Sequence, residues 1–175
     1  MLLRSNCMPK EILWFLNTCT YNKKMESTQF ANKCHMPEAY LQWFCTWFGE
    51  QTMENACLMA VFVENSTQDR TQFLCCNPAN AAVVLQIAES IQVHQLIPAS
   101  CIVILTPYVK QWSLYNINLL SMVKQANVSI DEYPCVYTVN SYQSKEADWV
   151  IFNVMVTGTK LGFMDDEGCT NVAYT

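Results

Sequence analysis

Two polar stretches of the chain carry side chains that could bind a ligand. TVNSYQSKEAD, at residues 138–148, lies between the apolar runs CVYTV and WVIFNVMV, and TPY, at residues 106–108, follows the apolar run CIVIL. Hydroxyl, amide and carboxylate groups placed at the ends of buried strands can donate or accept hydrogen bonds at a binding site. Taken alone, QSKEAD is more typical of a solvated loop whose carboxylates, Glu146 and Asp148, face water.

The ten cysteines are the other reactive side chains. No CxxC pair occurs, and the spacing of Cys75–Cys76 and of Cys34–His35 does not match a common zinc site, so buried thiols are expected rather than a metal site. A cysteine nucleophile is not expected either, because neither His35 nor His94 lies in a recognisable nucleophile motif. His94, near the end of an amphipathic stretch, is expected on the surface.

Apolar periodicity predicts the elements that position these residues. Pro9 and the apolar spacing after it predict a helix over residues 9–19, Asn77 and Pro78 begin a long helix, and residues 110–125 form another. Short apolar runs predict buried strands at residues 57–63, 101–105, 135–139 and 149–156. Residues 64–72 are expected to form a loop, and the conformation of residues 25–55 is left open.

The alternation of strands and helices predicts an α/β fold, with a parallel sheet covered by helices on both faces. Ligands bind at the carboxyl ends of the strands in such sheets. TPY and TVNSYQSKEAD both follow predicted strands, so we expect them to share one edge of the sheet.

Bulk composition limits the class of protein. A chain of 175 residues with 51% hydrophobic content predicts one domain over residues 1–175. The net charge of -5 argues against strong binding of nucleic acid by this chain alone. The apolar runs are too short to cross a bilayer, and MLLRSNCMPK lacks the apolar core of an export signal, so an intracellular protein of the nucleus or cytoplasm is expected.

The aromatic residues of AYLQWFCTWF could stack on bases, but core packing is the commoner use.

Four segments in order resemble the second RecA-like (P-loop NTPase-like) domain of superfamily 1 helicases of the nonsense-decay, senataxin and aquarius type. They are SNCMPKEILWFLNTCTYNKKM, CIVILTPYVKQ, VYTVNSYQSKEADWVIF and LGFMDDEGCTNVAYT. The family's versions run approximately as QYRMPxxIxxFxxxxFYNxxL, IGVITPYxxQ, VxTVDSFQGxExDxVI and GFLxDxRRLNVALTRA. The resemblance covers almost the whole chain and is weakest over residues 25–55, which would be a poorly matched insertion.

The resemblance implies a role for each matched residue. In this family two RecA-like domains close on ATP while single-stranded RNA or DNA runs across both, and the first domain supplies the P-loop and the magnesium carboxylates. Gln143 and Glu146 would lie at the nucleotide cleft. The residues that would face the nucleic-acid backbone are Thr106, Pro107, Tyr108, Thr138 and Ser141. Because GxxxxGK[ST] is absent here, ATP and magnesium are expected only together with a first RecA-like domain, and single strands are expected to bind weakly.

The chain also departs from the family pattern. Cys7 stands where the family has an arginine that binds the terminal phosphate. Gly168 and Cys169 stand where the family has two adjacent arginines. The sequence ends at Thr175, just before the position of the last arginine in the family's final motif. Asn140 and Ser144 replace an aspartate and a glycine. We therefore expect a second motor domain, incomplete at the C-terminus, that has no catalytic residues and is inactive alone. The alternative is a non-enzymatic, decayed fragment or a module that binds nucleic acid or protein.

Overall fold

The structure, a computed structural model, describes residues 4–5, 13–14, 17, 23–29, 38–49, 61–64, 66–71, 74–95, 97–143 and 145–155. The chain divides into two compact units, Met1–Val61 with Tyr174–Thr175, and Phe62–Ala173. The single domain expected over residues 1–175 stays a prediction.

The described residues of the first unit include the short strands β1 and β2 and the helix α2. β1 (Arg4–Ser5) pairs in parallel with β2 (Glu26–Ser27), and α2 spans Glu38–Phe48. Tyr40, Trp43 and Phe44 are buried on one face of α2, and the Tyr40 and Trp43 ring centroids lie 5.4 Å apart. Core packing therefore accounts for these three aromatic residues, whereas Trp47 on the same helix is exposed. Of the helix expected over residues 9–19, Leu13, Trp14 and Asn17 are helical and the remainder lies outside the described residues.

The second unit alternates strands and helices after an initial hairpin. Its elements are β3 (Asp69–Thr71), β4 (Leu74–Cys76), α3 (Pro78–Gln95), η2 (Ala99–Cys101), β5 (Ile102–Thr106), α4 (Val109–Ala126), η3 (Ile130–Glu132), β6 (Cys135–Thr138), α5 (Val139–Tyr142) and β7 (Trp149–Phe152). β3 and β4 pair antiparallel. The other three strands form a parallel sheet in the order β6-β5-β7.

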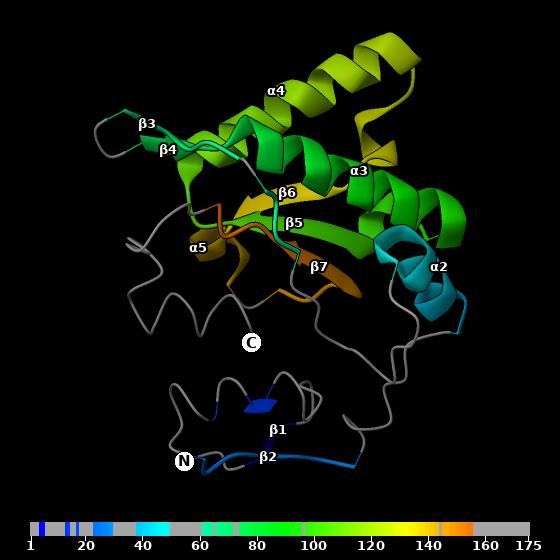
Figure 1. Ribbon diagram of the computed structural model, residues 1–175, viewed down its shortest axis with the longest axis vertical. Coiled ribbons are helices and arrows are strands. Elements are labelled where there is room, and N and C mark those ends of the chain that lie inside the picture. The colour runs from blue at the N-terminus through cyan, green and yellow to red at the C-terminus, as the bar shows by residue number, and fades with distance from the viewer. Residues whose placement is uncertain are drawn as a thin grey trace. The chain divides into compact units, whose positions relative to one another are not determined.

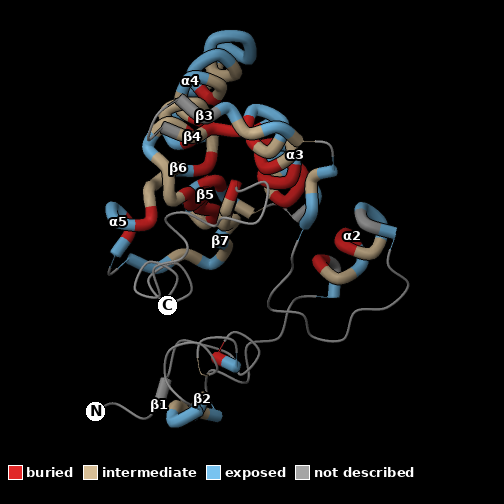
Figure 2. The backbone as a smooth tube through the Cα atoms, turned by 60° about the vertical axis from the view of Figure 1, so that its left-hand side comes forward, coloured by how far each residue is buried: buried red, intermediate tan, exposed pale blue. Residues whose placement is uncertain are grey.

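This sheet confirms the predicted α/β class. Figure 1 shows α3 and α4 on one side of the sheet and α5 toward the other. All five residues of β5 are buried, as expected for the central strand of a parallel sheet covered on its faces. Figure 2 shows this burial concentrated along β5 and on the side of α3 that faces the sheet.

Sequence-local signals set the ends of the long helices. Asn77 Oδ1 accepts a hydrogen bond from Asn80 N–H at 3.1 Å, so Asn77 caps α3 as predicted, and Pro78 is the first helical residue. α4 ends at Ala126, and the next residue, Asn127, adopts the left-handed conformation with φ of 54°. Asn tolerates this conformation better than most residues, so it suits the end of a helix. Residues at helical spacing, Gln111, Tyr115 and Leu119, form the buried face of α4.

Several predicted boundaries are wrong. Val61 to Val63 are not in a strand, and the side chain of Phe62 is 89% exposed. Residues 64–72, expected as a loop, contain β3. Val139 begins a helix instead of ending a strand, and Asn153 to Met155 lie beyond the end of β7. Apolar runs predict strands by composition alone, whereas a strand also needs a partner to pair with its backbone.

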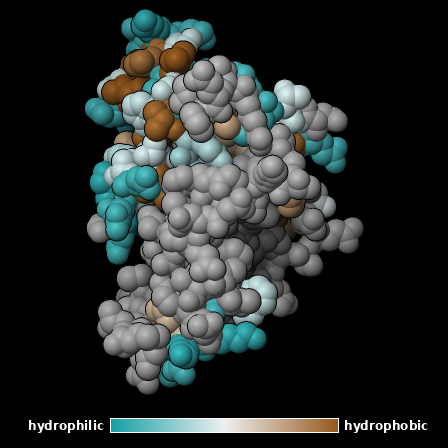
Figure 3. All heavy atoms as spheres, turned by 90° about the vertical axis from the view of Figure 1, so that its left-hand side faces the viewer, coloured by the Kyte–Doolittle hydropathy of each residue, from teal (hydrophilic) through white to brown (hydrophobic). Residues whose placement is uncertain are grey.

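The outer face of α4 carries exposed apolar side chains. Val109, Ile117 and Leu120 are all more than half exposed, and Figure 3 shows hydrophobic side chains gathered in the upper region that α4 occupies. Within the described ranges, we find no helix with the length and hydropathy needed to span a bilayer.

Candidate functional site at the carboxyl edge of the sheet

The two polar stretches meet at the carboxyl edge of the sheet. Thr106 ends β5 and Thr138 ends β6, and the two are register partners. Pro107 and Tyr108 continue from β5, and Ser141 lies in α5, directly after β6. The structure thus brings these five residues together as predicted, and we call them the carboxyl-edge cluster.

Thr106 supports the turn that leads into α4. Its side chain is fully buried, and its Oγ1 accepts a hydrogen bond from Tyr108 N–H at 3.5 Å. Thr106 does not itself cap α4, because the N-cap residue is Tyr108. Thr106 precedes that position because it still belongs to β5, where it pairs with Thr138. Pro107 and Tyr108 are half-buried, so they form the accessible part of the turn.

Thr138 and Ser141 hold α5 by reciprocal hydrogen bonds. Ser141 N–H donates to Thr138 Oγ1 at 3.4 Å, and Thr138 N–H donates to Ser141 Oγ at 3.0 Å. This is the arrangement of a capping box, with serine in place of the usual glutamate or glutamine. The spacing of two hydroxyl residues three positions apart was the sequence signal for α5, which the prediction of a loop missed.

The second half of the polar loop leaves the carboxyl edge. Gln143 directly follows α5, but Asp148 hydrogen-bonds to the Cys101 thiol and so raises the pKa of that thiol. Cys101 precedes β5 and Asp148 precedes β7, so this contact lies at the amino edge of the sheet. We expected all of residues 138–148 to share one edge of the sheet with TPY. This expectation is wrong for Asp148, which lies at the opposite edge. The loop must cross the sheet because β7 runs parallel to β5.

Aromatic contacts hold the crossing loop against the sheet. Tyr142 packs with Val103 and Leu105, and its ring centroid lies 5.3 Å from that of Tyr137. Lys145 Nζ lies 4.2 Å from the centroid of the Tyr137 ring, which is cation–π geometry.

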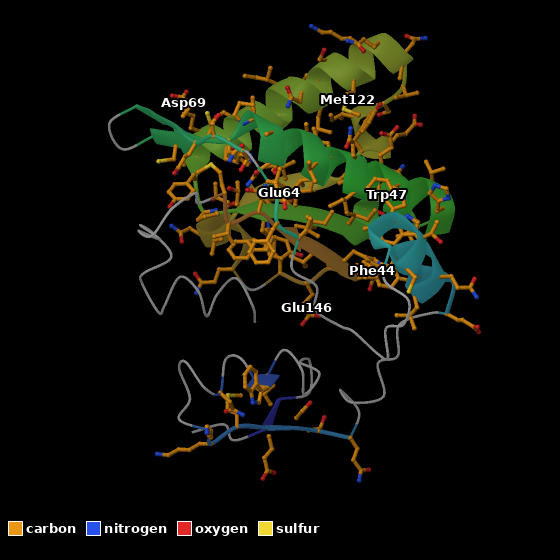
Figure 4. The ribbon with its side chains drawn as sticks, in the orientation of Figure 1. Phe44, Trp47, Glu64, Asp69, Met122 and Glu146 are labelled. Carbon is orange, nitrogen blue, oxygen red and sulfur yellow. The ribbon has the colours of Figure 1, made fainter. Side chains whose placement is uncertain are left out.

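Glu146 lies on this side of the sheet, close to the buried tyrosine. Burial raises the pKa of Tyr142, and the charges of Tyr137 and Glu146 raise it further. Figure 4 shows Glu146 on the opposite side of the sheet from α3 and α4. Gln143 and Glu146 are both exposed, and their predicted contacts with a nucleotide stay predictions.

Asp69 and Lys110 form an ion pair that the sequence did not indicate. Lys110 Nζ lies 2.7 Å from Asp69 Oδ2, and Cys76 Sγ lies 3.8 Å from the same oxygen. The pair joins the β3–β4 hairpin to the first turn of α4, two residues beyond Tyr108, and Figure 4 places Asp69 on this hairpin. The hydrogen bond with Lys110 and its charge lower the pKa of Asp69, and the same contact raises the pKa of Lys110.

Asp69→Asn should lower the chemical-denaturation midpoint slightly at neutral pH, because exposed ion pairs contribute little stability. The pKa of Asp69 is lower in the folded state than its ordinary value of 3.8, so the pair stabilises the fold fully above 3.8. This contribution should disappear as the pH falls below that value, since Asp69 then becomes protonated. Urea midpoints for wild type, Asp69→Asn, Lys110→Met and the double variant test this coupling. A wild-type advantage over Asp69→Asn that is unchanged under strong acid would contradict it.

The other residues singled out from the sequence are only partly described. Asn140 is exposed on α5, and Cys7, Cys34, His35, Ser144, Gly168 and Cys169 lie outside the described residues. The described cysteines, Cys45, Cys75, Cys76, Cys101 and Cys135, are free, and Cys135 is exposed, unlike the buried thiols that were expected. Among the described residues there is no group of three or more His, Cys, Asp or Glu side chains able to hold a metal ion.

An enclosed pocket does not compete with the sheet edge as a binding site. The cavity between α3 and α4, lined by Leu85, Leu119 and Met122 among others, has a volume of about 20 Å³. Pockets for small molecules usually measure about 300 to 1,000 Å³, so this cavity is far too small for a ligand. The carboxyl-edge cluster, whose members other than Thr106 are at least partly accessible, is therefore the better candidate.

Comparison with known proteins places the chain in a family. No curated protein matches it, but the model of the AAA domain family (AAA_12) matches residues 1–175. This domain occurs in the C-terminal regions of superfamily 1 helicases and points to a helicase-like domain of the P-loop NTPase class. The parallel sheet flanked by helices is consistent with such a domain. The chain belongs to the AAA domain family.

Proposed function

We propose that this chain is the second motor domain of an ATP-dependent RNA or DNA helicase of the nonsense-decay, senataxin and aquarius type. The observation that carries the proposal is the register pairing of Thr106 with Thr138, which places the TPY turn beside the start of α5. The hydroxyl and backbone N–H groups at such an edge can contact successive phosphates without reading the base sequence. The domain would hold a single strand at this edge while a first RecA-like domain binds the nucleotide phosphates.

The described residues could bind the base and ribose of a nucleotide but not its phosphates. Gln143 and Glu146 are exposed and could accept or donate hydrogen bonds to base and ribose. The lysine between them in the loop, Lys145, lies over the Tyr137 ring, and the sequence has no P-loop to surround phosphates. ATP and magnesium therefore require the first domain, and we assign this chain no chemical step.

Tyr108→Ala should weaken the binding of a fluorescent single-stranded RNA or DNA about tenfold, because it removes the most accessible large side chain of the carboxyl-edge cluster. A tenfold loss corresponds to about 1.4 kcal/mol, within the range of about 0.5 to 1.5 kcal/mol that one typical hydrogen bond contributes. Fluorescence anisotropy at low salt measures the affinity. Wild-type binding should itself be weak, because the net charge of -5 disfavours contact with a polyanion, and added salt should weaken whatever part of it depends on Lys and Arg.

Tyr133→Ala is the matched control. Tyr133 is also a half-buried tyrosine, but it lies before β6, toward the amino edge of the sheet. Equal losses of affinity in the two variants would exclude the carboxyl edge as the binding surface. The alternative, a non-enzymatic module that binds nucleic acid or protein, is separated from a motor domain by adding a first RecA-like domain and measuring ATP hydrolysis.

A further inference from the structure

Four buried polar side chains lie next to the carboxyl edge. Asn77 precedes α3, Gln111 and Tyr115 are one turn apart on α4, and Asn153 follows β7. All four side chains are at least 95% buried. They come from three separate segments of the second unit. Buried polar groups cost stability unless they are hydrogen-bonded, so such a cluster needs a structural or functional explanation.

Gln111 ties α4 to the residue that caps α3. Its Oε1 accepts a hydrogen bond from Asn77 N–H at 2.7 Å, and its Nε2 donates to Asn77 O at 3.3 Å. The Gln111 side-chain amide therefore bonds to both the backbone N–H and the backbone carbonyl of Asn77, in the way that a paired β-strand bonds to its neighbour. Gln111 lies three residues after Tyr108, so this pair of bonds fixes the first turn of α4 directly behind the TPY turn.

Tyr115 and Asn153 extend the contact to the sheet. Asn153 N–H donates to Leu105 O at 2.8 Å, next to Thr106 at the end of β5. The Tyr115 hydroxyl lies beside the Gln111 and Asn153 side chains; burial raises its pKa, and these two neighbours act in the opposite direction. Among the described residues, the Tyr115 hydroxyl, Asn77 Nδ2 and Asn153 Oδ1 make no hydrogen bond of good geometry. The cluster thus costs stability that an apolar contact would not cost.

We propose that Gln111 is a positioning residue: by holding α4 to Asn77, it sets the geometry of Pro107 and Tyr108 for binding a single strand. This inference rests on the proposed function of the carboxyl-edge cluster. Gln111 itself is fully buried, so its side chain would act through the turn and not by touching the strand. Its amide is required because both bonds to Asn77 are needed to fix the first turn of α4.

Gln111→Glu tests this role through pH. The ionised carboxylate still accepts from Asn77 N–H but cannot donate to Asn77 O, so single-strand affinity should fall about tenfold relative to wild type at neutral pH. Burial raises the pKa of a carboxyl group, so the introduced side chain should become protonated in mild acid and regain its donor. The ratio of variant to wild-type Kd should then return toward one.

Gln125→Glu is the charge-matched control. Gln125 is exposed on the same helix, so this variant adds the same negative charge without touching Asn77. It should bind almost as well as wild type at neutral pH. Gln111→Met, which has similar length and no ionisable group, should bind weakly at every pH. Equal affinities for Gln111→Glu and Gln125→Glu, or a loss in Gln111→Glu that mild acid does not reverse, would overturn the inference.

Hydrogen exchange at Tyr108 N–H separates this inference from the proposed function. Measured without nucleic acid, exchange should be faster in Gln111→Glu than in wild type at neutral pH, and the two should converge in mild acid. If single strands do not bind to wild type but this pattern holds, the proposed function fails and the positioning of the turn stands. Unchanged exchange in Gln111→Glu would refute the positioning role.

Discussion

The 175-residue chain should release no phosphate from ATP above background, with or without single-stranded RNA or DNA. Catalysis of phosphoryl transfer depends on positive charge and magnesium held around the terminal phosphate. The sequence has no P-loop, and Cys7, Gly168 and Cys169 stand where the resembling helicases have arginines. An arginine at such a site is worth about 10³ to 10⁵ in rate, and a thiol has neither its charge nor its paired donors.

Phosphate release is measured beside a Glu146→Ala variant, which identifies turnover that belongs to this chain. A contaminating ATPase would be unaffected by Glu146→Ala. Hydrolysis that single strands stimulate and that Glu146→Ala abolishes would show that the chain is an enzyme by itself. The proposal of a domain inactive without its partner would then be wrong.

Ile104→Ala should lower the free energy of unfolding by about 2 to 5 kcal/mol. Ile104 lies at the centre of β5, the middle strand of the sheet, and its side chain is fully buried. Truncating it removes apolar contacts and leaves a cavity that the surrounding strands cannot close. Urea unfolding followed by circular dichroism measures the loss.

Ile117→Ala removes the same atoms from a surface position. Ile117 is 64% exposed on the outer face of α4, so this variant should change stability by no more than about 0.5 kcal/mol. Alanine also favours a helix more than isoleucine does, which offsets part of any loss. Equal destabilisation by the two variants would contradict the assignment of β5 as the centre of the core.

Local patterns were sufficient to predict the two longest helices, α3 and α4, and the central strand β5. Asn77 and Pro78 mark the start of α3, because capping and the fixed φ of proline act over a few residues. CIVIL predicted β5 to within one residue, since a continuous apolar run of this length suits a strand buried on both faces. The strand predicted at residues 57–63 was wrong at Val61 to Val63, because strand formation also depends on a pairing partner.

The meeting of two motifs at one edge could also be predicted. In a parallel sheet every strand that ends in a polar stretch places it at the same edge, so Thr106 and Thr138 had to be neighbours once β5 and β6 were adjacent. The return of residues 145–148 to the amino edge follows from the same rule, because β7 must begin there. The four-residue helix α5 was missed because its signal, two hydroxyl groups at Thr138 and Ser141, is also common in loops.

By itself, the sequence determined the order of α3, β5, α4, β6 and β7, the class of sheet and the resemblance to helicase domains, because these depend on periodicity, capping and motif order. Only the tertiary structure decided that Gln111 bonds to Asn77, 34 residues away, and that Lys110 pairs with Asp69, 41 residues away. No local pattern marks a glutamine as buried or a lysine as paired. These contacts form because the packing of α3, α4 and the β3–β4 hairpin brings distant polar groups together, and burial makes leaving Gln111 and Asn77 unbonded costly.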